Sequence, residues 1–283
     1  MADNRKPRDD EIDVFGLTHQ GKVRKDNQDQ FMLATVHKRF SVLQTSLPDG
    51  TPLPLADERV AFLAMVADGV GGGFGGQKAS ATALEVVTEY VTSSSACFLH
   101  ADSSEQEFIH TLQEAALRSH DAVRARAMIE AEGRAMATTL TLYMGVWPYY
   151  YLLQVGDSRY YLYREGALTQ VSRDQTIAQE LVDKGVLTRA VAERSRLADV
   201  LSSAIGADEA APVVTRLKSE WGLVHLLCTD GLTKHVSDER IAEVLGSMTS
   251  AKQAAETLLQ EALADGGTDN ITIIIGRPQR RDV

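Results

Sequence analysis

The chain has 283 residues, of which 44% are hydrophobic and 24% charged, and its 29 basic and 39 acidic side chains give a net charge of −10. This composition is typical of a globular protein that buries a large core without disulfide bonds, organised as one large domain or two small ones. The negative charge argues against nucleic-acid and anionic-membrane binders, since both require a basic face.

The number of cysteines and the N-terminal residues indicate the cellular compartment. Cys97 and Cys228 are too few for a disulfide framework and suggest a reducing environment. Residues 1–12 are strongly charged and lack the apolar run of a signal peptide, so we expect a disordered leader. No stretch reaches the roughly 18 apolar residues that a spanning helix needs. The sequence predicts a cytoplasmic protein without a membrane partner.

The first half of the chain mixes short apolar runs with helical patterns. A proline-rich segment, residues 46–57, predicts a long loop, and Asp68-Gly69 ends a buried strand. Ser104-x-x-Glu107 is a capping box that predicts the start of a long helix. We expect strands at residues 14–17, 31–36 and 62–67, and helices at 77–91 and from 104 to about 133.

The second half is richer in β patterns and ends in helices. Residues 172–212 are polar and helical in character, and they form an excursion between strands. Long hairpins with segregated helices favour α+β layers over a doubly wound parallel sheet. We expect strands at residues 138–144, 149–155, 158–163, 223–228 and 271–275, and helices at 237–245 and 250–264.

Four aspartates lie at the ends of predicted strands. Asp68, Asp157 and Asp230 each follow an apolar run, and Asp269 directly precedes one. Each could be a turn residue, because Asp and Gly are favoured in turns. Alternatively, the strand ends meet at one edge and pool their carboxylates, which then need protonation or cations. Oxygen ligands of this kind suit hard cations such as Mg²⁺ or Mn²⁺. Spacing alone leaves both interpretations open.

Six short motifs surround these aspartates. They are Gly21-x-x-Arg24-x-x-Asn27-Gln28-Asp29, Val66-Ala67-Asp68-Gly69-Val70-Gly71-Gly72, Ala137-Thr138-Thr139-Leu140, Val155-Gly156-Asp157-Ser158-Arg159, Leu227-Cys228-Thr229-Asp230-Gly231 and Asp269-Asn270-Ile271-Thr272. In this order, over residues 16–276, they resemble the motifs of the bacterial-type, metal-dependent type 2C (PPM) Ser/Thr protein phosphatases.

The resemblance implies a fold and a domain layout. The fold would be a four-layer αββα sandwich of two antiparallel sheets flanked by helices. One catalytic domain would span residues 13–278, with a flap at about 172–212 and a tail at 279–283.

The resemblance also implies a dinuclear metal site. Asp68 would bridge both metals, the carbonyl of Gly69 would bind the second, and Asp230 and Asp269 would complete the first. Asp157, together with Asp230, would hold a third metal. The cofactor would thus be Mn²⁺ or Mg²⁺, with two or three ions per chain.

Further residues of these motifs would surround the metals. Arg24 would hold the substrate phosphate, since a guanidinium fits a phosphate with two parallel hydrogen bonds. Gln28, Asp29 and Asn270 would lie just outside the metal ligands. Gln28 departs from the family, where a glutamate is usual, so the site carries one carboxylate fewer. The flap departs too, with Asp174-Gln175-Thr176 in place of the common Asp-His-Ser and Ser195-Arg196 in place of His-Pro.

The implied activity is hydrolysis of phosphoserine and phosphothreonine by a metal-activated water. The implied partners are phosphoprotein substrates and a cognate Ser/Thr kinase, and we expect a monomer. A catalytically weak pseudophosphatase that binds phosphoproteins is the alternative. All four metal aspartates and Arg24 are present, which favours the enzyme.

Other chemistries fit less well. Gly71-x-Gly73-x-x-Gly76 matches a dinucleotide-binding pattern, but Asp68-Gly69 intervenes between the strand and these glycines. A cysteine phosphatase needs an arginine six residues after its cysteine, and here Ser103 and Lys234 stand at those positions.

Overall fold

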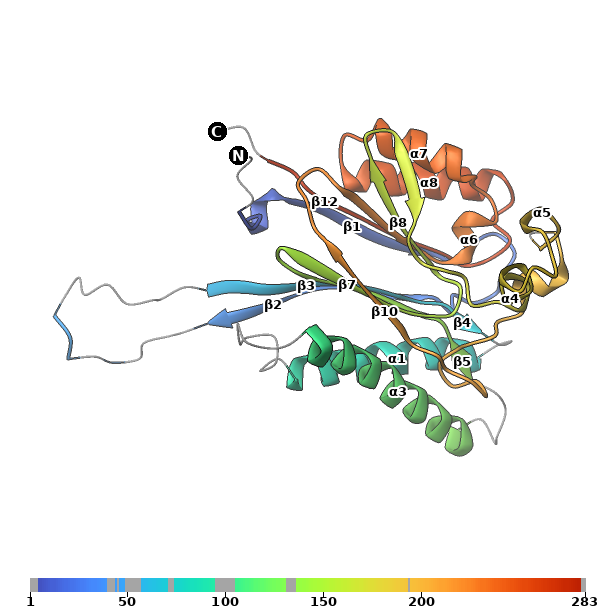
Figure 1. Cartoon of the computed structure of the whole chain (residues 1–283), viewed down its shortest axis with the longest axis horizontal. Coiled ribbons are helices and arrows are strands. Elements are labelled where there is room, and N and C mark those ends of the chain that lie inside the picture. The colour runs from blue at the N-terminus through green and yellow to red at the C-terminus, as the bar shows by residue number, and fades with distance from the viewer. Residues whose placement is uncertain are drawn as a thin grey trace.

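The structure is a computed structural model, and it describes residues 5–39, 44, 46–48, 57–70, 74–94, 105–130, 136–192 and 194–280. Two antiparallel five-stranded sheets lie face to face, and helices cover the outer face of each (Figure 1). The predicted four-layer αββα sandwich is therefore confirmed. None of the described helices is both long and apolar enough to cross a membrane.

The first sheet has its apolar strands at the centre. Residues Ile271 to Ile275 are buried because the second sheet covers one face and helices cover the other. Cys228 pairs with Ile273, and the Thr229 N–H donates to the Thr272 carbonyl, which brings the end of one predicted strand beside the start of the last. The strands, in spatial order, are β1 (Ile12–His19), β12 (Ile271–Pro278), β11 (Val224–Cys228), β8 (Arg159–Arg164) and β9 (Ala167–Gln170).

The second sheet is built in the same way. Its central strands, β6 (Leu140–Val146) and β3 (Asp57–Ala67), carry buried residues on both faces, whereas the edge strand β2 (Gln30–Arg39) is more exposed. A short ribbon of β4 (Gly69–Val70) and β5 (Ala137–Thr138) continues from it. The strands, in spatial order, are β10 (Val213–Lys218), β7 (Tyr149–Val155), β6 (Leu140–Val146), β3 (Asp57–Ala67) and β2 (Gln30–Arg39).

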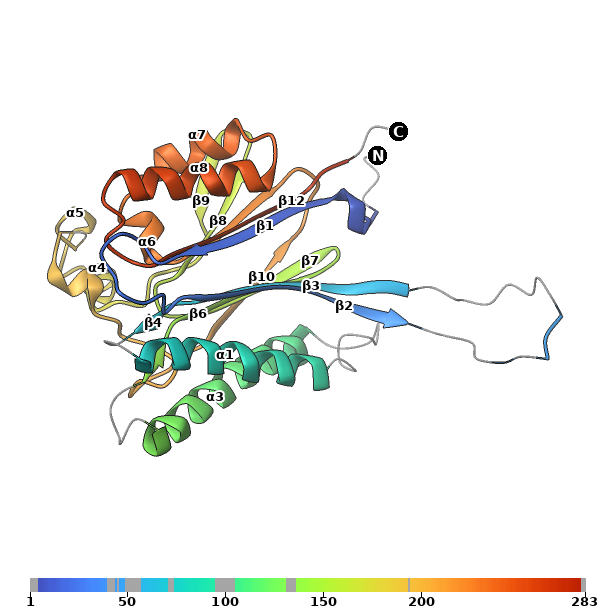
Figure 2. The ribbon, with the colours of Figure 1, turned by 180° about the vertical axis from the view of Figure 1, so that it is seen from behind.

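Two groups of helices cover the outer faces of the sheets. α1 (Phe74–Ser93) and α3 (Glu105–Glu130) cover the second sheet, and α6 (Asp230–Thr233), α7 (Asp238–Gly246) and α8 (Ala251–Ala264) lie on the first (Figure 2). The side chains of Ser237 and Ser250 cap α7 and α8, since each accepts a backbone N–H three residues on. The predicted cap at Ser104 lies outside the described residues.

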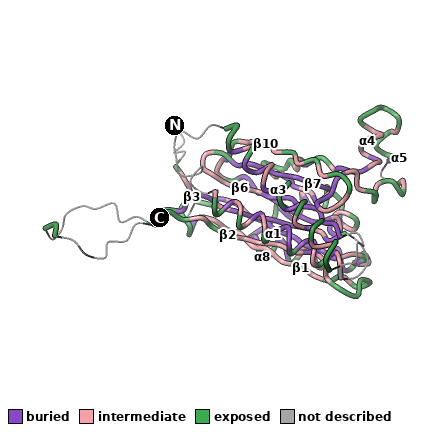
Figure 3. The backbone as a smooth tube through the Cα atoms, turned by 90° about the horizontal axis from the view of Figure 1, so that it is seen from below, coloured by how far each residue is buried: buried purple, intermediate pink, exposed green. Residues whose placement is uncertain are grey.

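The excursion over residues 172–212 projects from one end of the sandwich, where β4, β5 and α6 also lie (Figure 1). It holds α4 (Ile177–Asp183), α5 (Arg189–Ala192) and a short 3-10 helix (Arg196–Asp199). Figure 3 shows that the outer part of this segment, over residues 183–192 and 194–200, is largely exposed, whereas residues 203–205 are buried.

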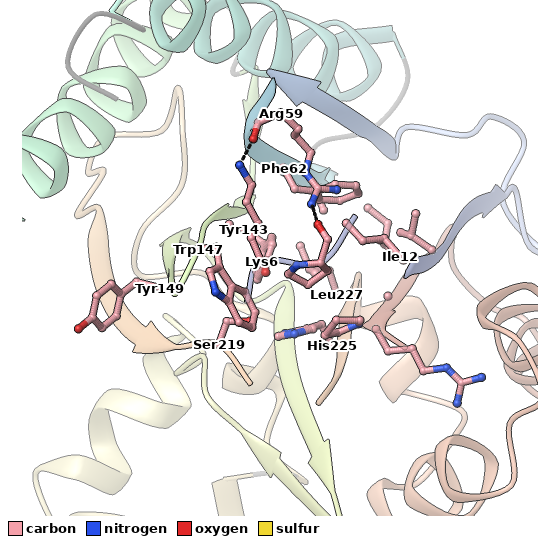
Figure 4. Close-up of a pocket in the computed structure, with 18 of the residues that line it drawn as sticks. Lys6, Ile12, Arg59, Phe62, Tyr143, Trp147, Tyr149, Ser219, His225 and Leu227 are labelled. Carbon is pink, nitrogen blue, oxygen red and sulfur yellow. Dashed lines mark hydrogen bonds between the residues drawn. The ribbon is translucent and has the colours of Figure 1, made fainter. Parts of the chain in front are cut away.

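The predicted disordered leader is wrong for residues 5–12. Glu11 is only 2% exposed and is paired with Arg5, and a 3-10 helix (Asp9–Glu11) leads directly into β1. Figure 4 shows how the segment is held: Lys6 donates to the carbonyl of Arg59, and the Arg59 guanidinium donates to the carbonyl of Pro7. These charged side chains find partners on β3, which composition alone does not reveal.

Candidate metal and phosphate site

The predicted site residues gather in one cleft at the flap end of the sandwich. Eight of the nine line it, namely Arg24, Gln28, Asp68, Gly69, Asp157, Asp230, Asp269 and Asn270. The ninth, Asp29, is 1% exposed and lies beneath the cleft. Loops from both sheets therefore meet here, as the strand-end positions of the aspartates predict.

Asp68 is fixed through its backbone. Its N–H donates to the hydroxyl of Thr139 at 3.0 Å, and its carbonyl accepts from the Thr139 N–H and the Thr138 hydroxyl. Thr139 is in turn hydrogen-bonded to Ser158 at 2.7 Å. The Ala137-Thr138-Thr139-Leu140 motif thus positions Asp68.

Gly69 lies where no side chain would fit. A Cβ atom there would come within 2.4 Å of the Gly76 carbonyl oxygen and 2.8 Å of that of Gln28. The close approach brings the start of α1 and the Gln28 loop against β4. Gly71 and Gly73 lie outside the described residues.

Asp29 joins the two sheets. It directly precedes β2 of the second sheet. Its Oδ2 accepts hydrogen bonds from Thr229, which directly follows β11, at 2.8 Å and from Thr272 on β12 at 2.7 Å. Burial raises the pKa of Asp29 to about 7, although the two threonine hydrogen bonds oppose this rise. Asp29 is therefore a buried clamp beneath the cleft.

Asn270 holds the loop that carries Arg24. Its Nδ2 donates to the carbonyls of Gln20 and Asp26, and its Oδ1 accepts from the N–H of Gln28. Because every polar atom of this amide is used, an aspartate could not replace it without losing donors.

The carboxylates raise one another's pKa. Burial raises the pKa of Asp68 well above its usual value, and the charges of Asp29 and Asp230 add to the rise. Burial and the charge of Asp230 likewise raise the pKa of Asp157 to about 7. Such a cluster is unfavourable unless cations neutralise it.

Two cationic side chains meet these carboxylates. The guanidinium of Arg24 contacts Asp269 through Nε and Nη2, each at 2.8 Å. Lys234 Nζ lies 2.6 Å from Asp230 and 3.2 Å from Asp269. Burial alone would raise the pKa of Asp269, but Arg24 and Lys234 outweigh it and the pKa is lowered. The sequence analysis missed Lys234 in this role, although it lies one helical turn after Asp230.

The donor set suits hard divalent cations. The Oδ1 atom of Asp230 is buried and has no hydrogen-bond partner among the described residues, so this oxygen is available to bind a cation. The donors around it are carboxylate and carbonyl oxygens, as Mg²⁺ and Mn²⁺ prefer. Within the described part of the chain, no three Asp, Glu, His or Cys side chains already stand in a metal-binding group. Lys234 and Arg24 occupy several of the oxygens instead.

The flap residues that stand in place of the family's common Asp-His-Ser have structural roles in this protein. Gln175 accepts the N–H of Gly156 at 2.8 Å and donates to the carbonyl of Ala211, so it holds the Asp157 loop. Asp174 forms a bidentate ion pair with Arg159, and Thr176 caps α4. These residues position the flap against β8 without a histidine.

A second pocket lies between the sheets at the opposite end, behind the N-terminal segment (Figure 4). Its walls are mainly apolar and aromatic, and include Phe62, Tyr143 and Leu227. No carboxylate of a described residue lines it, so it lacks the chemistry of the cleft.

Comparison with known proteins gives consistent matches. The serine/threonine protein phosphatase PstP of Mycobacterium tuberculosis is 33% identical over 217 residues, which are 76% of this chain and 40% of PstP, so the chain spans about two-fifths of that relative. The serine/threonine phosphatase stp of Listeria monocytogenes is 28% identical over 214 residues, covering 75% of this chain and 83% of that protein.

A solved structure extends the likeness to three dimensions. It is the catalytic domain of PstP in complex with two manganese ions, and it matches with a TM-score of 0.72 and 27% identity over 95% of this chain and 99% of that one. A family model described as protein phosphatase 2C matches residues 55–265, which include Asp68, Asp157 and Asp230. With most of its length in that match and its aspartates gathered in one cleft, the chain belongs to the protein phosphatase 2C family.

Proposed function

We propose that this protein is a metal-dependent serine/threonine protein phosphatase that hydrolyses phosphoserine and phosphothreonine in proteins. The observation that carries the proposal is the convergence of Asp68, Asp157, Asp230 and Asp269 in one cleft beside Arg24. A buried oxygen of Asp230 also has no hydrogen-bond partner in the part of the chain that the structure describes. The manganese ions of the PstP structure support the same chemistry.

The cofactors would be two or three Mn²⁺ or Mg²⁺ ions. Asp68, the carbonyl of Gly69, Asp230 and Asp269 would hold two of them, and Asp157 with Asp230 would hold any third. When bound, such ions supply Lewis-acid activation of a water and of the phosphoryl group. The protein's share is to fix the ligands in place, through Thr138 and Thr139 at Asp68 and through Asn270 beside Asp269.

Arg24 would orient the substrate. It lies at the mouth of the cleft with 55% of its side chain exposed, and its bonds to Asp269 use Nε and Nη2. Among the described residues Nη1 has no carboxylate partner, so it can donate to a phosphate oxygen. The exposed mouth suits a phosphorylated side chain presented by a protein.

The expected partners follow from this activity. They are phosphoproteins and the Ser/Thr kinase that modifies them. We also propose that the protein is monomeric and cytoplasmic. The buried, free thiol of Cys228 is in keeping with a reducing compartment.

The test is hydrolysis of p-nitrophenyl phosphate and of pSer, pThr and pTyr peptides, with Mn²⁺, with Mg²⁺ and in excess chelator. Turnover should require the metal and favour pSer and pThr. Asp230→Asn should abolish it, while Asp121→Asn, an exposed change on α3, should leave it unchanged. Turnover in chelator would refute the mechanism. Phosphopeptide binding without turnover in either metal would favour the pseudophosphatase.

A further inference from the structure

Lys234 lies among three carboxylates from three parts of the fold. Its Nζ is 2.6 Å from Asp230 on α6, 3.2 Å from Asp269 before β12, and 3.9 Å from Asp199 in the flap. Each contact joins a different segment to the same ammonium group. Such convergence goes beyond an ordinary helical i, i+4 pair.

The ammonium stays charged at this position. A lysine side chain is ordinarily protonated at neutral pH, and here carboxylate oxygens of three residues face its Nζ. The ammonium therefore acts as a fixed cation on the flap side of the cluster.

The two oxygens of Asp230 have different surroundings. Oδ2 binds Lys234, whereas Oδ1 is buried without a hydrogen-bond partner among the described residues. Asp157, Asp199, Asp230 and Lys234 line both the metal cleft and the neighbouring pocket beneath the flap. A divalent cation that bridged Asp157 and Asp230 on this side would meet the ammonium at close range, and like charges repel.

We propose that Lys234 takes the place of one divalent cation at the carboxylate cluster, so that this protein binds one metal ion fewer than its aspartates would otherwise hold. This inference rests on the proposed function and deepens it, because it predicts that each chain binds two metal ions and not three. The Oδ1 side of Asp230 remains for a metal, and the Oδ2 side belongs to the lysine. Through Asp199, the ammonium group of Lys234 also links the carboxylate cluster to the flap.

The test is a direct count of bound Mn²⁺ by equilibrium dialysis and metal analysis, at rising free Mn²⁺. Lys234→Gln should bind one Mn²⁺ more per chain than the wild type, and Lys234→Met should do the same. Lys234→Arg keeps the charge and should keep the wild-type number. Lys25→Gln is the matched control, since Lys25 lines the same cleft and is exposed.

The outcomes separate the inference from the proposed function. If both neutral variants are folded by circular dichroism and bind the wild-type number of ions, the inference is wrong while the phosphatase proposal stands. If Lys25→Gln also gains an ion, general charge and not the place of Lys234 sets the count. Wild-type protein that binds no Mn²⁺ would overturn both.

Discussion

His225 should make the folded protein sensitive to acid. It lies on β11 between the sheets and is 7% exposed, and its Nδ1 is hydrogen-bonded to the Tyr160 hydroxyl at 2.6 Å. Tyr143 and Tyr150 pack their rings against it from β6 and β7. Burial raises the pKa of each of these tyrosines, so all three stay neutral. No carboxylate is among these neighbours to stabilise an imidazolium.

The size of the effect follows from the pKa. Burial lowers the pKa of His225 from 6.5 to about 4 in the folded protein. The unfolded chain therefore binds the proton more tightly, and the free energy of unfolding falls as pH drops from 6.5 toward 4. Since one decade of proton affinity is worth about 1.4 kcal/mol, His225 should cost about 2 kcal/mol at pH 5 and about 3 kcal/mol below pH 4.

Urea denaturation at pH 7.5 and pH 5, followed by tryptophan fluorescence in chelator, measures this cost. In His225→Asn the Oδ1 atom can still accept from Tyr160, but the side chain cannot be protonated. The variant should therefore lose about 2 kcal/mol less than the wild type between the two pH values. His110→Asn, an exposed change on α3, should follow the wild type. Equal pH dependence of wild type and His225→Asn would refute the reasoning.

Three further predictions concern the cleft and its supports. Gln28→Glu adds a carboxylate to the cleft lining and should lower the half-saturating Mn²⁺ concentration about tenfold by calorimetry, a change of about 1.4 kcal/mol; unchanged affinity would place Gln28 outside the influence of the metals. Asp174→Ala leaves Arg159 partly buried without its bidentate partner and should lower the free energy of unfolding by about 2 kcal/mol, whereas the same change at exposed Asp208 should be nearly neutral. Gly231→Ala would place a Cβ atom 1.9 Å from the Asn270 carbonyl oxygen, so it should cost about 3 kcal/mol in urea denaturation; wild-type stability would show that α6 can shift away from β12.

Patterns among neighbouring residues predict those strands and helix caps that depend only on neighbouring residues. The run Tyr149–Val155 is observed as predicted, because aromatic and branched residues there fill a buried strand. The caps at Ser237 and Ser250 also depend on neighbours three residues away. Strands β9 and β10 were not predicted, since both are short edge strands with half-exposed side chains.

The supports of the site could not be predicted in this way. Asp29 is recognisable in its motif, but its partners Thr229 and Thr272 lie 200 and 243 residues away, so its clamping role appears only in the fold. The contact of Lys234 with Asp269 is equally remote, although its spacing from Asp230 was a readable signal. Motifs identified the residues that face the cleft, whereas tertiary packing determines what holds them.

The carboxylate site lies at the flap end of the sandwich, where hydrogen bonds and ion pairs hold the loops together. A limited apolar layer that includes Val66, Leu227 and Ile274 joins the two sheets, while larger apolar clusters lie beneath the outer helices. Carboxylates crowded at the flap end repel one another and act to separate the loops there. The Asp29 clamp, Asn270 and the cations Arg24 and Lys234 oppose that separation. The charge that prepares the cleft for divalent cations is thus held by hydrogen bonds and ion pairs, and those of Asp29 join the two sheets.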